Sequence, residues 1–185
     1  MLKDIHCFIL YIFGNVVARH FYGDSIFKSR HFASFRSIGW RWLCVCFFMQ
    51  KILGINRHVP WPVSPRNIIG DARNIVFDAD DLNNFMMGGC YFQAYGARIV
   101  IGKGTYIAPN VGLITQNHDI ADLSIRSEAK DIIIGCNCWI GMNSVVLPGV
   151  ILGDNTIVGA GAVVTKSFPK GNIVIGGVPA VSIRC

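Results

Sequence analysis

The sequence predicts an all-β solenoid that follows a short helical segment. Three observations lead to this prediction: a six-residue aliphatic repeat, 20 glycines among 185 residues, and an apolar, basic N-terminus without the repeat. The length suits one domain with a short appended segment. With 52% hydrophobic and 15% charged residues, the composition excludes a disordered chain. No run of about 18 apolar residues lacks a charge, so a membrane-spanning bundle is not expected.

Residues 1–65 are predicted to form the first region, an apolar, basic segment that is helical. Residues 1–70 carry nine Lys or Arg and two Asp, 9 − 2 = +7, whereas residues 71–185 carry 8 − 9 = −1. This distribution argues against nucleic-acid binding by the main body. Trp40–Met49, flanked by basic residues, has the composition of an interfacial helix, and a helix that packs on the main domain is the alternative. Trp61–Pro65 predicts an extended linker.

The compartment is predicted from the N-terminus and the cysteines. Ile5–Phe13 is apolar, but Asp4 balances Lys3, so a cleaved signal peptide is not expected. The seven cysteines show no disulfide or zinc-site spacing, which predicts reduced, mostly buried thiols. We therefore expect a cytoplasmic protein, with peripheral contact to the cytoplasmic membrane face through residues 1–60.

Aliphatic residues recur every six positions over much of the second region, residues 66–185. The series is Ile101, Ile107, Leu113, Ile134, Ile140, Val146, Leu152, Val158 and Val164. A period of six suits short strands separated by tight corners, with the aliphatic side chain pointing inward. The next residue is often Gly or Ala, which relieves crowding at the corner. Such coils bury their apolar sides only against one another, so caps are expected at the ends.

The two halves of the repeat are out of phase by three residues, which predicts a loop that leaves the coil at residues 119–131. Asn117 falls on a position of the repeat that should point inward. Loops on a rigid scaffold often carry function. Upstream of the repeat, a methionine and aromatic cluster is expected to build broader first coils: Met86, Met87, Tyr91, Phe92 and Tyr95.

Several short motifs follow one another between residues 99 and 184: Ile107–Val111, Asn117–Asp119, Trp139–Gly141, Leu147–Val150, Val158–Gly161, Val163–Lys166 and Gly177–Ala180. This ordered set resembles the hexapeptide-repeat acyltransferases, most closely the galactoside and maltose O-acetyltransferase branch and related polysaccharide O-acetyltransferases. The resemblance implies a left-handed parallel β-helix, an exception to the usual right-handed crossover. It also implies a homotrimer with active sites between subunits and acetyl-CoA along the coils.

The resemblance also assigns site residues. It makes His118 the catalytic base. The residues assigned to the acyl donor are Trp139, Met142, Ala160, Thr165, Lys166 and Arg184. The candidate acceptor contacts are Asn117, Asp119, Tyr91 and Gln93. The sequence departs from the branch at Met142, where a serine is usual, at Val181, where a second arginine is usual, and throughout residues 1–65.

Acetyl transfer from a thioester to a hydroxyl needs a base, a shielded cavity and donors for the oxyanion. Neutral imidazole suits the base, and His118 is the one histidine within the repeat region. Asp119 or a backbone carbonyl could orient its ring. A cysteine nucleophile at Cys136 or Cys138 is disfavoured, because Cys138 falls on an inward position.

The predicted function is an acetyl-CoA-dependent O-acetyltransferase that acts on a saccharide hydroxyl, such as a cell-surface polysaccharide or its lipid-linked precursor. One alternative is an acyltransferase with serine or an antibiotic as acceptor. Another is a metalloenzyme similar to the γ-class carbonic anhydrases, which would need three histidines on zinc. A non-catalytic assembly module is the fourth possibility. No metal and no nucleic-acid partner are expected.

Overall fold

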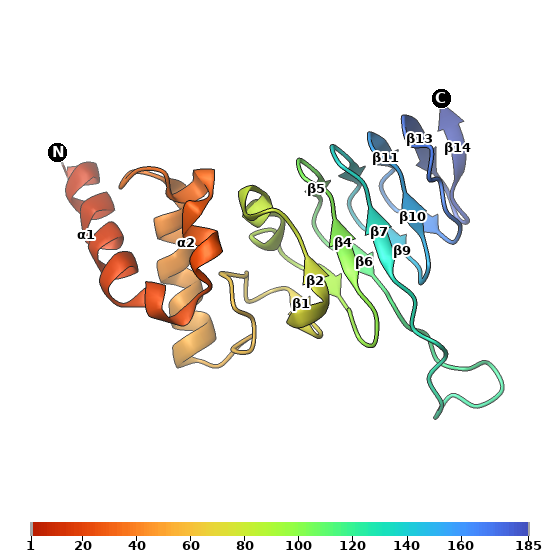
Figure 1. Ribbon diagram of the computed structural model, residues 1–185, viewed down its shortest axis with the longest axis horizontal. Coiled ribbons are helices and arrows are strands. Elements are labelled where there is room, and N and C mark those ends of the chain that lie inside the picture. Colours follow the sequence, from red (N-terminus) through yellow and green to blue (C-terminus); the bar gives the residue numbers. More distant parts are fainter. Residues whose placement is uncertain (1, 185) are drawn as a thin grey trace. The chain divides into compact units, whose positions relative to one another are not determined.

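The computed structural model describes residues 2–184, and for Leu2 and Arg184 it describes the backbone alone. The chain divides into two compact units, residues 1–65 and 66–185 (Figure 1). The first unit consists of α1 (Leu2–Val16), η1 (Ala18–Phe21), η2 (Asp24–Lys28), η3 (Arg30–Phe32), α2 (Ile38–Phe47) and η4 (Phe48–Ile52). About 28% of the chain is helical, so the all-β prediction describes the second unit and not the whole chain.

In the first unit, α1 packs against α2 through a glycine. A Cβ added at Gly14 would lie 2.6 Å from the indole ring of Trp40, so only glycine lets the helices approach this closely. The ring of Tyr11 meets the same indole edge-on, with 5.0 Å between ring centres. Trp40 and Leu43 are buried at this contact. The aromatic side chains therefore give the unit a core of its own.

A buried amide ties the chain after α2 to this core. Gln50 is fully buried, and its Oε1 accepts a hydrogen bond from the Tyr22 hydroxyl at 3.0 Å. Its Nε2 donates to the Trp61 carbonyl at 3.2 Å, and its Oε1 also accepts from the Val63 amide at 3.3 Å. Trp61 and Val63 are themselves buried. Trp61–Pro65 contains no helix, in line with the predicted linker, and its buried residues pack into the first unit.

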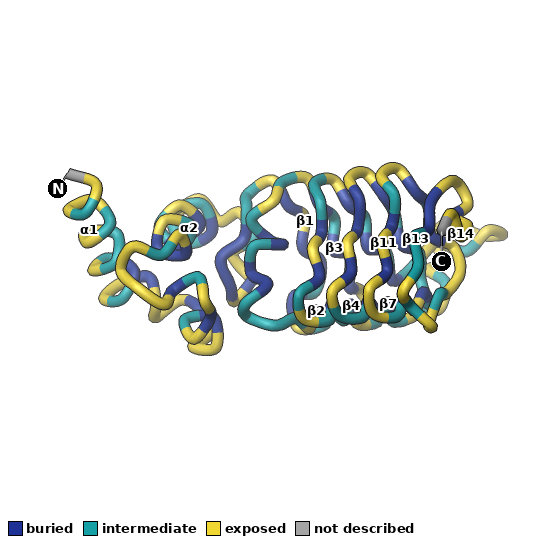
Figure 2. Tube along the Cα trace, turned by 90° about the horizontal axis from the view of Figure 1, so that it is seen from above, coloured by how far each residue is buried: buried dark blue, intermediate teal, exposed yellow. Residues whose placement is uncertain are grey.

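The second unit is built from three sheets of very short strands, stacked like the rungs of a ladder (Figures 1 and 2). Sheet A contains β1 (Ile68–Ile69), β3 (Tyr91–Phe92), β6 (Gly112–Leu113), β9 (Val145–Val146) and β12 (Val163–Val164). Sheet B contains β2 (Ile75–Val76), β4 (Ile99–Ile101), β7 (Ile132–Ile134) and β10 (Ile151–Leu152). Sheet C contains β5 (Tyr106–Ile107), β8 (Trp139–Ile140), β11 (Thr156–Val158), β13 (Ile173–Gly176) and β14 (Val181–Arg184).

Each regular coil passes through sheets B, C and A in turn and is made of three hexapeptides. Val145 pairs in parallel with Val163, and Trp139 pairs with Ile157. In both pairs the partners stand at the same position of the repeat, three hexapeptides apart. The nine aliphatic residues of the repeat are all buried, which confirms their predicted inward direction. In Figure 2 the buried residues alternate with exposed ones along the coils.

Glycine relieves crowding in the coils, as predicted, and the structure shows where that crowding arises. Gly102 does not have a positive φ; a Cβ there would lie 2.4 Å from the backbone carbon of Gly135 in the next coil. The left-handed corner positions are occupied by other glycines, such as Gly104 and Gly161 with φ of 76° and 70°, and by asparagines such as Asn110 and Asn143, with φ of 61° and 60°. Their side chains are hydrogen-bonded at 3.1 Å across adjacent coils. Glycine therefore allows close stacking at positions such as Gly102, and glycine and asparagine share the left-handed corners.

We expect Gly102→Ala to lower the free energy of unfolding by about 1–3 kcal/mol, because the nearest atoms are backbone atoms that cannot rotate away. Gly112→Ala is the matched control, since the nearest side chain to its Cβ lies at 3.6 Å. That variant should stay within about 0.5 kcal/mol of the native chain. Thermal unfolding compares the two. Equal stability of both variants would show that the coils do not pack as tightly as described.

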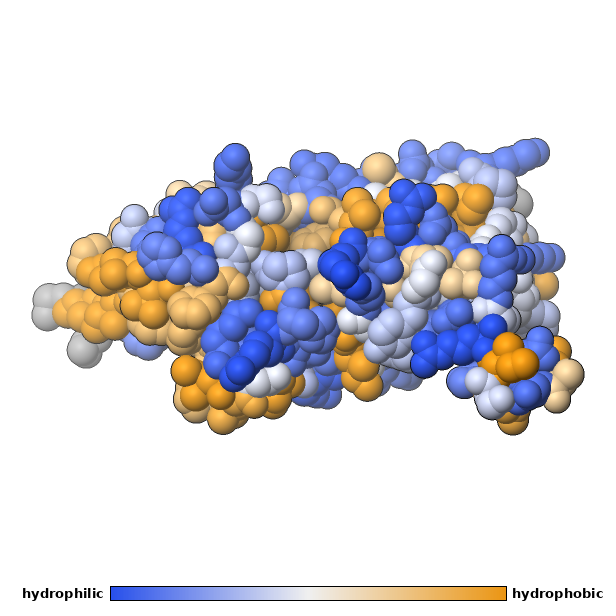
Figure 3. Space-filling model, turned by 60° about the horizontal axis from the view of Figure 1, so that its bottom comes forward, coloured by the Kyte–Doolittle hydropathy of each residue, from blue (hydrophilic) through white to orange (hydrophobic). Residues whose placement is uncertain are grey.

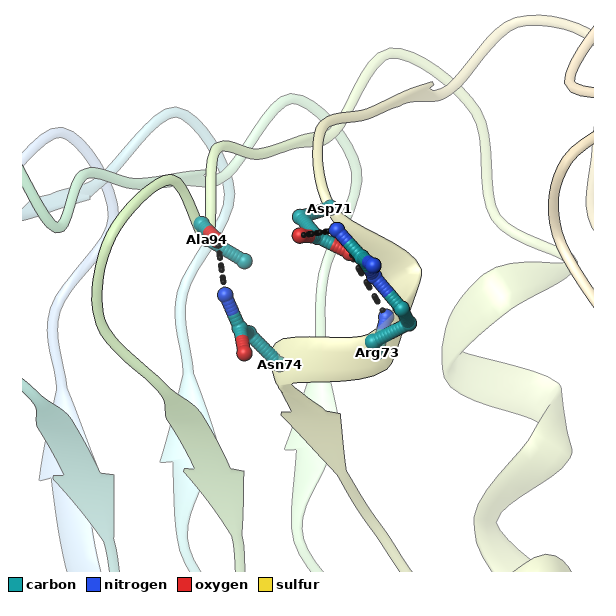
Figure 4. Close-up of polar contacts among 4 residues, drawn as sticks. All are labelled: Asp71, Arg73, Asn74 and Ala94. Carbon is teal, nitrogen blue, oxygen red and sulfur yellow. Dashed lines mark hydrogen bonds and ion pairs between the residues drawn. The ribbon is translucent and has the colours of Figure 1, made fainter.

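Both ends of the second unit are closed by irregular elements. The first coil contains η5 (Ala72–Asn74), where the Asn74 amide donates to the Ala94 carbonyl at 3.0 Å beside an Asp71–Arg73 ion pair (Figure 4). Next comes η6 (Ala79–Phe85), whose buried Asn84 side chain donates to the Thr105 carbonyl at 2.8 Å and thereby covers the edge of sheet C.

The opposite end is closed by β14, which pairs antiparallel with β13. The predicted caps are therefore present at both ends. The methionine and aromatic cluster lies in the first coils, but only part of it is core. Phe92 is fully buried, whereas Met87 and Tyr95 are exposed.

Candidate functional site

A long excursion interrupts the coils between β6 and β7 (Figure 1, teal). From Gly112 to its strand partner Val145, the chain has nearly twice as many residues as from Val145 to its partner Val163. The Lys130 amide donates to the Thr115 carbonyl at 2.9 Å and closes the base of the excursion. The excursion thus occupies about residues 116–130, whereas the phase of the repeat predicted 119–131.

The predicted inward position of Asn117 was wrong. Asn117 is exposed, and the last inward side chain before the excursion is Thr115, which is fully buried. The Thr115 hydroxyl donates to the Tyr95 carbonyl at 3.1 Å. The phase shift revealed that residues had been inserted but not where the chain leaves the coil.

The excursion is an ordered hairpin. His118 and Arg126 form an antiparallel bridge, and the Asp119 amide donates to the Ile125 carbonyl at 2.9 Å. The Asp119 carboxylate accepts from the Ala121 amide at 2.8 Å, which makes a local turn at the tip. Asp119 therefore stabilises the turn of the loop, because its carboxylate accepts a hydrogen bond from the backbone.

A backbone carbonyl orients the His118 ring. Nδ1 lies 2.7 Å from the carbonyl oxygen of Leu123. A carbonyl can only accept, so Nδ1 carries the hydrogen, and Nε2 of the neutral ring holds a lone pair. Of the two groups that the sequence offered for this role, the carbonyl is the one found. His118 is exposed, so Nε2 is accessible to a proton donor.

Side chains of the preceding coil hold the base of the hairpin. Gln93 Oε1 accepts from the Gln116 amide at 2.8 Å. The guanidinium of Arg126 lies 5.8 Å from the centre of the Tyr95 ring. Arg98 donates to Asp131 from its backbone amide and from its guanidinium, and these hydrogen bonds lower the pKa of the Asp131 carboxyl. Gln93, a candidate acceptor contact, thus also anchors the loop.

Two of the predicted donor-binding residues occupy equivalent corners of successive coils. Met142 and Ala160 both stand at the corner between sheets C and A, and both are exposed. The Gly161 amide donates to the Met142 carbonyl at 2.8 Å across this corner. Trp139 lies on β8 of sheet C with 56% of its surface exposed. All three residues are exposed on the outside of the coils.

The other predicted donor contacts lie elsewhere. Thr165 and Lys166 follow β12 at the corner between sheets A and B, and both are exposed. The Lys166 ammonium lies 5.7 Å from the centre of the Phe168 ring. The side chain of Arg184 lies outside the described part of the chain. The candidate acceptor residue Tyr91 is half-buried on β3 of sheet A.

The site residues therefore form two groups on the second unit. The His118 hairpin leaves the corner between sheets A and B, whereas Met142 and Ala160 lie at the corner between sheets C and A. Sheet A separates these two corners. The described chain alone thus does not bring the base together with Met142 and Ala160.

Cys138, which precedes Trp139, is not suited to act as a nucleophile. Cys138 is buried, and its thiol donates to the Gly153 carbonyl at 3.3 Å. Burial raises the pKa of the Cys138 thiol, which disfavours the reactive thiolate. Among the described residues, no group of three or more His, Cys, Asp or Glu side chains is placed to hold a metal ion.

Comparison with known proteins supports the hexapeptide resemblance. Residues 131–166 match the family model described as bacterial transferase hexapeptide (six repeats). The galactoside O-acetyltransferase of Escherichia coli K12 is 44% identical over 111 residues, which is 55% of this chain and 54% of that protein. WcaF of the same organism, which is named as a colanic acid biosynthesis acetyltransferase, is 36% identical over 125 residues. The match covers 68% of this chain and 59% of that protein.

Among solved structures, a variant of AntD, an N-acyltransferase from Bacillus cereus, matches with a TM-score of 0.50 at 17% identity, over 66% of this chain and 79% of that one. The chain spans about half the length of the curated relatives it matches. The resemblance to hexapeptide-repeat acetyltransferases is thus confirmed. Together with the parallel sheets, it supports a left-handed β-helix.

Proposed function

We propose that this chain is an acetyl-CoA-dependent O-acetyltransferase whose acceptor is a saccharide hydroxyl. The observation that carries the proposal is the hydrogen bond from Nδ1 of the His118 ring to the Leu123 carbonyl, which leaves Nε2 to accept a proton. The names of the relatives support the reaction class, since they include galactoside and colanic acid acetyltransferases.

The proposed reaction is a direct transfer. Nε2 of His118 takes the proton of the acceptor hydroxyl as its oxygen attacks the thioester carbon. The tetrahedral intermediate then expels the CoA thiolate, which takes a proton from the imidazolium. The acetyl ester and free CoA are the products, and no covalent enzyme intermediate forms. The Leu123 carbonyl positions the ring and favours the imidazolium while it carries the extra proton.

We also propose that the site is completed by a second copy of the chain. His118 and the Met142–Ala160 corner lie beyond opposite ends of the strands of sheet A. One copy would therefore contribute the base, and its neighbour the donor-binding corner. A closed ring of three copies satisfies this arrangement. Sedimentation should then report a species of about 61 kDa, three times 20.4 kDa. A stable monomer at micromolar concentration would leave the shared site without support.

For the location of the protein, we propose the cytoplasm, with peripheral contact of the first unit to the cytoplasmic membrane face. A lipid-linked saccharide would be met there. None of the helices in residues 2–184 is long and apolar enough to cross a membrane.

Thiol release from acetyl-CoA, measured with a panel of sugars and lipid-linked saccharides, tests the proposed function. We expect at least one saccharide to accelerate the release of free CoA and to yield an acetyl ester that mass spectrometry detects. Serine and aminoglycosides in the same panel test the other acceptor classes. Release that no saccharide accelerates would contradict the proposal.

A further inference from the structure

One face of α1 is apolar and exposed although the opposite face is packed. Gly14 is buried against α2, and Leu10 accepts a hydrogen bond from the Cys44 thiol at 3.7 Å. The exposed face carries Ile5, Phe8, Ile9, Ile12 and Val16, which are between 45% and 64% exposed. Their spacing of three and four residues forms a continuous stripe along the helix. Because both faces of α1 are apolar, we expect the exposed face to be buried against another apolar surface as well.

The positive charge of the chain is concentrated in the unit that carries this stripe. Residues 1–65 hold eight Lys or Arg and two Asp, 8 − 2 = +6, while residues 66–185 hold nine of each sign. Figure 3 shows hydrophilic side chains interspersed with the wide apolar surface of this unit. Basic side chains around an exposed apolar helix face are typical of binding to anionic lipid.

A hollow of about 410 Å³ lies beside the stripe and shares Phe8 with it. Its walls are aromatic: Phe8, Tyr11, Phe27, Phe35 and Trp40. Arg19 and Lys28 also line it. Asp24 lies 3.7 Å from the Arg19 guanidinium and offsets part of the charge of that group. The hollow thus combines apolar walls with two cations, which suits an anionic headgroup attached to a hydrocarbon chain.

We propose that α1 lies in the headgroup region of an anionic phospholipid bilayer, with its exposed stripe inserted, and that Arg19 and Lys28 hold a lipid phosphate at the adjoining hollow. This inference rests on the proposed membrane contact and names its helix face and its lipid chemistry. The 15 residues of α1 span about 22 Å, shorter than the hydrocarbon core, so the helix lies in the plane of the interface. A second copy of the unit is disfavoured as the occupant, because two units that each carry a net charge of +6 repel each other.

Flotation of the full chain with lipid vesicles tests the inference. The wild-type chain should float with vesicles of phosphatidylglycerol and phosphatidylcholine, and less with phosphatidylcholine alone. High salt should reduce the anionic component of binding, because it screens charge. A wild-type chain that never floats would overturn both the inference and the proposed membrane contact. Thiol release with a soluble acceptor would still report on the proposed catalytic function.

Two variants and a matched control locate the binding surface. Ile9→Ser with Ile12→Ser should lower the partition onto anionic vesicles by roughly tenfold or more, because both side chains leave the inserted stripe. Arg19→Gln with Lys28→Gln should remove most of the preference for phosphatidylglycerol. The control is Ile68→Ser with Val76→Ser, which changes two exposed aliphatic residues of the second unit and should bind like the wild type.

The variants also separate the possible failures. Equal flotation of the stripe variant and the control would overturn the role of α1 while leaving membrane contact in place. An unchanged preference for phosphatidylglycerol in the Arg19 and Lys28 variant would overturn the phosphate site. All variants should release thiol at the wild-type rate with a soluble acceptor, because none changes a residue assigned to catalysis.

Discussion

Replacing His118 with alanine is expected to lower kcat by roughly 10²- to 10⁴-fold, the range for loss of a general base. Nε2 is the atom that would take the proton, and no neighbouring carboxylate replaces it, because Asp119 bonds the Ala121 amide. KM for acetyl-CoA should change little, since the ring is not assigned to donor binding. Steady-state thiol release under saturating acceptor measures both constants.

The fold should survive this substitution because His118 is exposed on the hairpin and does not fill an inward position. His20→Ala, an exposed histidine of the first unit, serves as the control and should retain full activity. A folded His118→Ala chain with nearly full activity would refute the assignment of the base.

Introducing a large side chain at the corner between sheets C and A is expected to weaken donor binding. Ala160→Trp should raise KM for acetyl-CoA by roughly 10- to 100-fold, because the indole would occupy surface next to Met142 that the donor is proposed to cover. kcat at saturating donor should change less. Titration of acetyl-CoA in the thiol-release assay gives both constants.

Val76→Trp is the matched control for this prediction. Val76 is exposed on β2, at the other end of sheet B from β10, away from all residues assigned to the donor, and its replacement also adds a large side chain. KM should then remain near the wild-type value. Equal increases in KM for both variants would indicate a general effect on the coils. An unchanged KM for Ala160→Trp would indicate that acetyl-CoA binds elsewhere.

The interior of the coils could be predicted from the sequence because it depends on period alone. Every aliphatic residue at the six-residue spacing is buried, since the alternation of side chains along each short strand leaves no other register. The use of glycine could not be derived this way. The need for glycine at Gly102 comes from the backbone of Gly135, which is distant in the sequence and lies in the next coil. A contact of that kind is visible only once the coils are stacked.

The hairpin shows where sequence reasoning reaches its limit. The phase shift predicted an insertion, but the exit at Thr115 depends on which residue last fits the interior. The orientation of the His118 ring depends on the Leu123 carbonyl, and the sequence does not indicate where a backbone carbonyl will lie. Asp119 and Asp122 carried a signal of a different kind, because short acidic side chains favour the local turns in which both are found.

The first unit was predicted to be helical from composition, but its packing was not. Gln50 gives no sign in the sequence that it is buried, yet it bonds Tyr22, Trp61 and Val63. The stripe on α1 is readable as a period of three and four residues, but only the structure shows that α2 covers the opposite face. Amphipathic patterns predict a buried face poorly when both faces are apolar.

The most direct test of the account is to mix two variant chains that are each nearly inactive at low acetyl-CoA and to look for recovered activity. His118→Ala lacks the base and Ala160→Trp obstructs the donor corner, so a mixed trimer can pair an intact base from one chain with an intact corner from the other. Co-expression in equal amounts, assayed at low acetyl-CoA, should restore about a quarter of wild-type activity, the chance that both halves of a site are intact. Activity no higher than the mean of the two separate variants would contradict a site shared between copies.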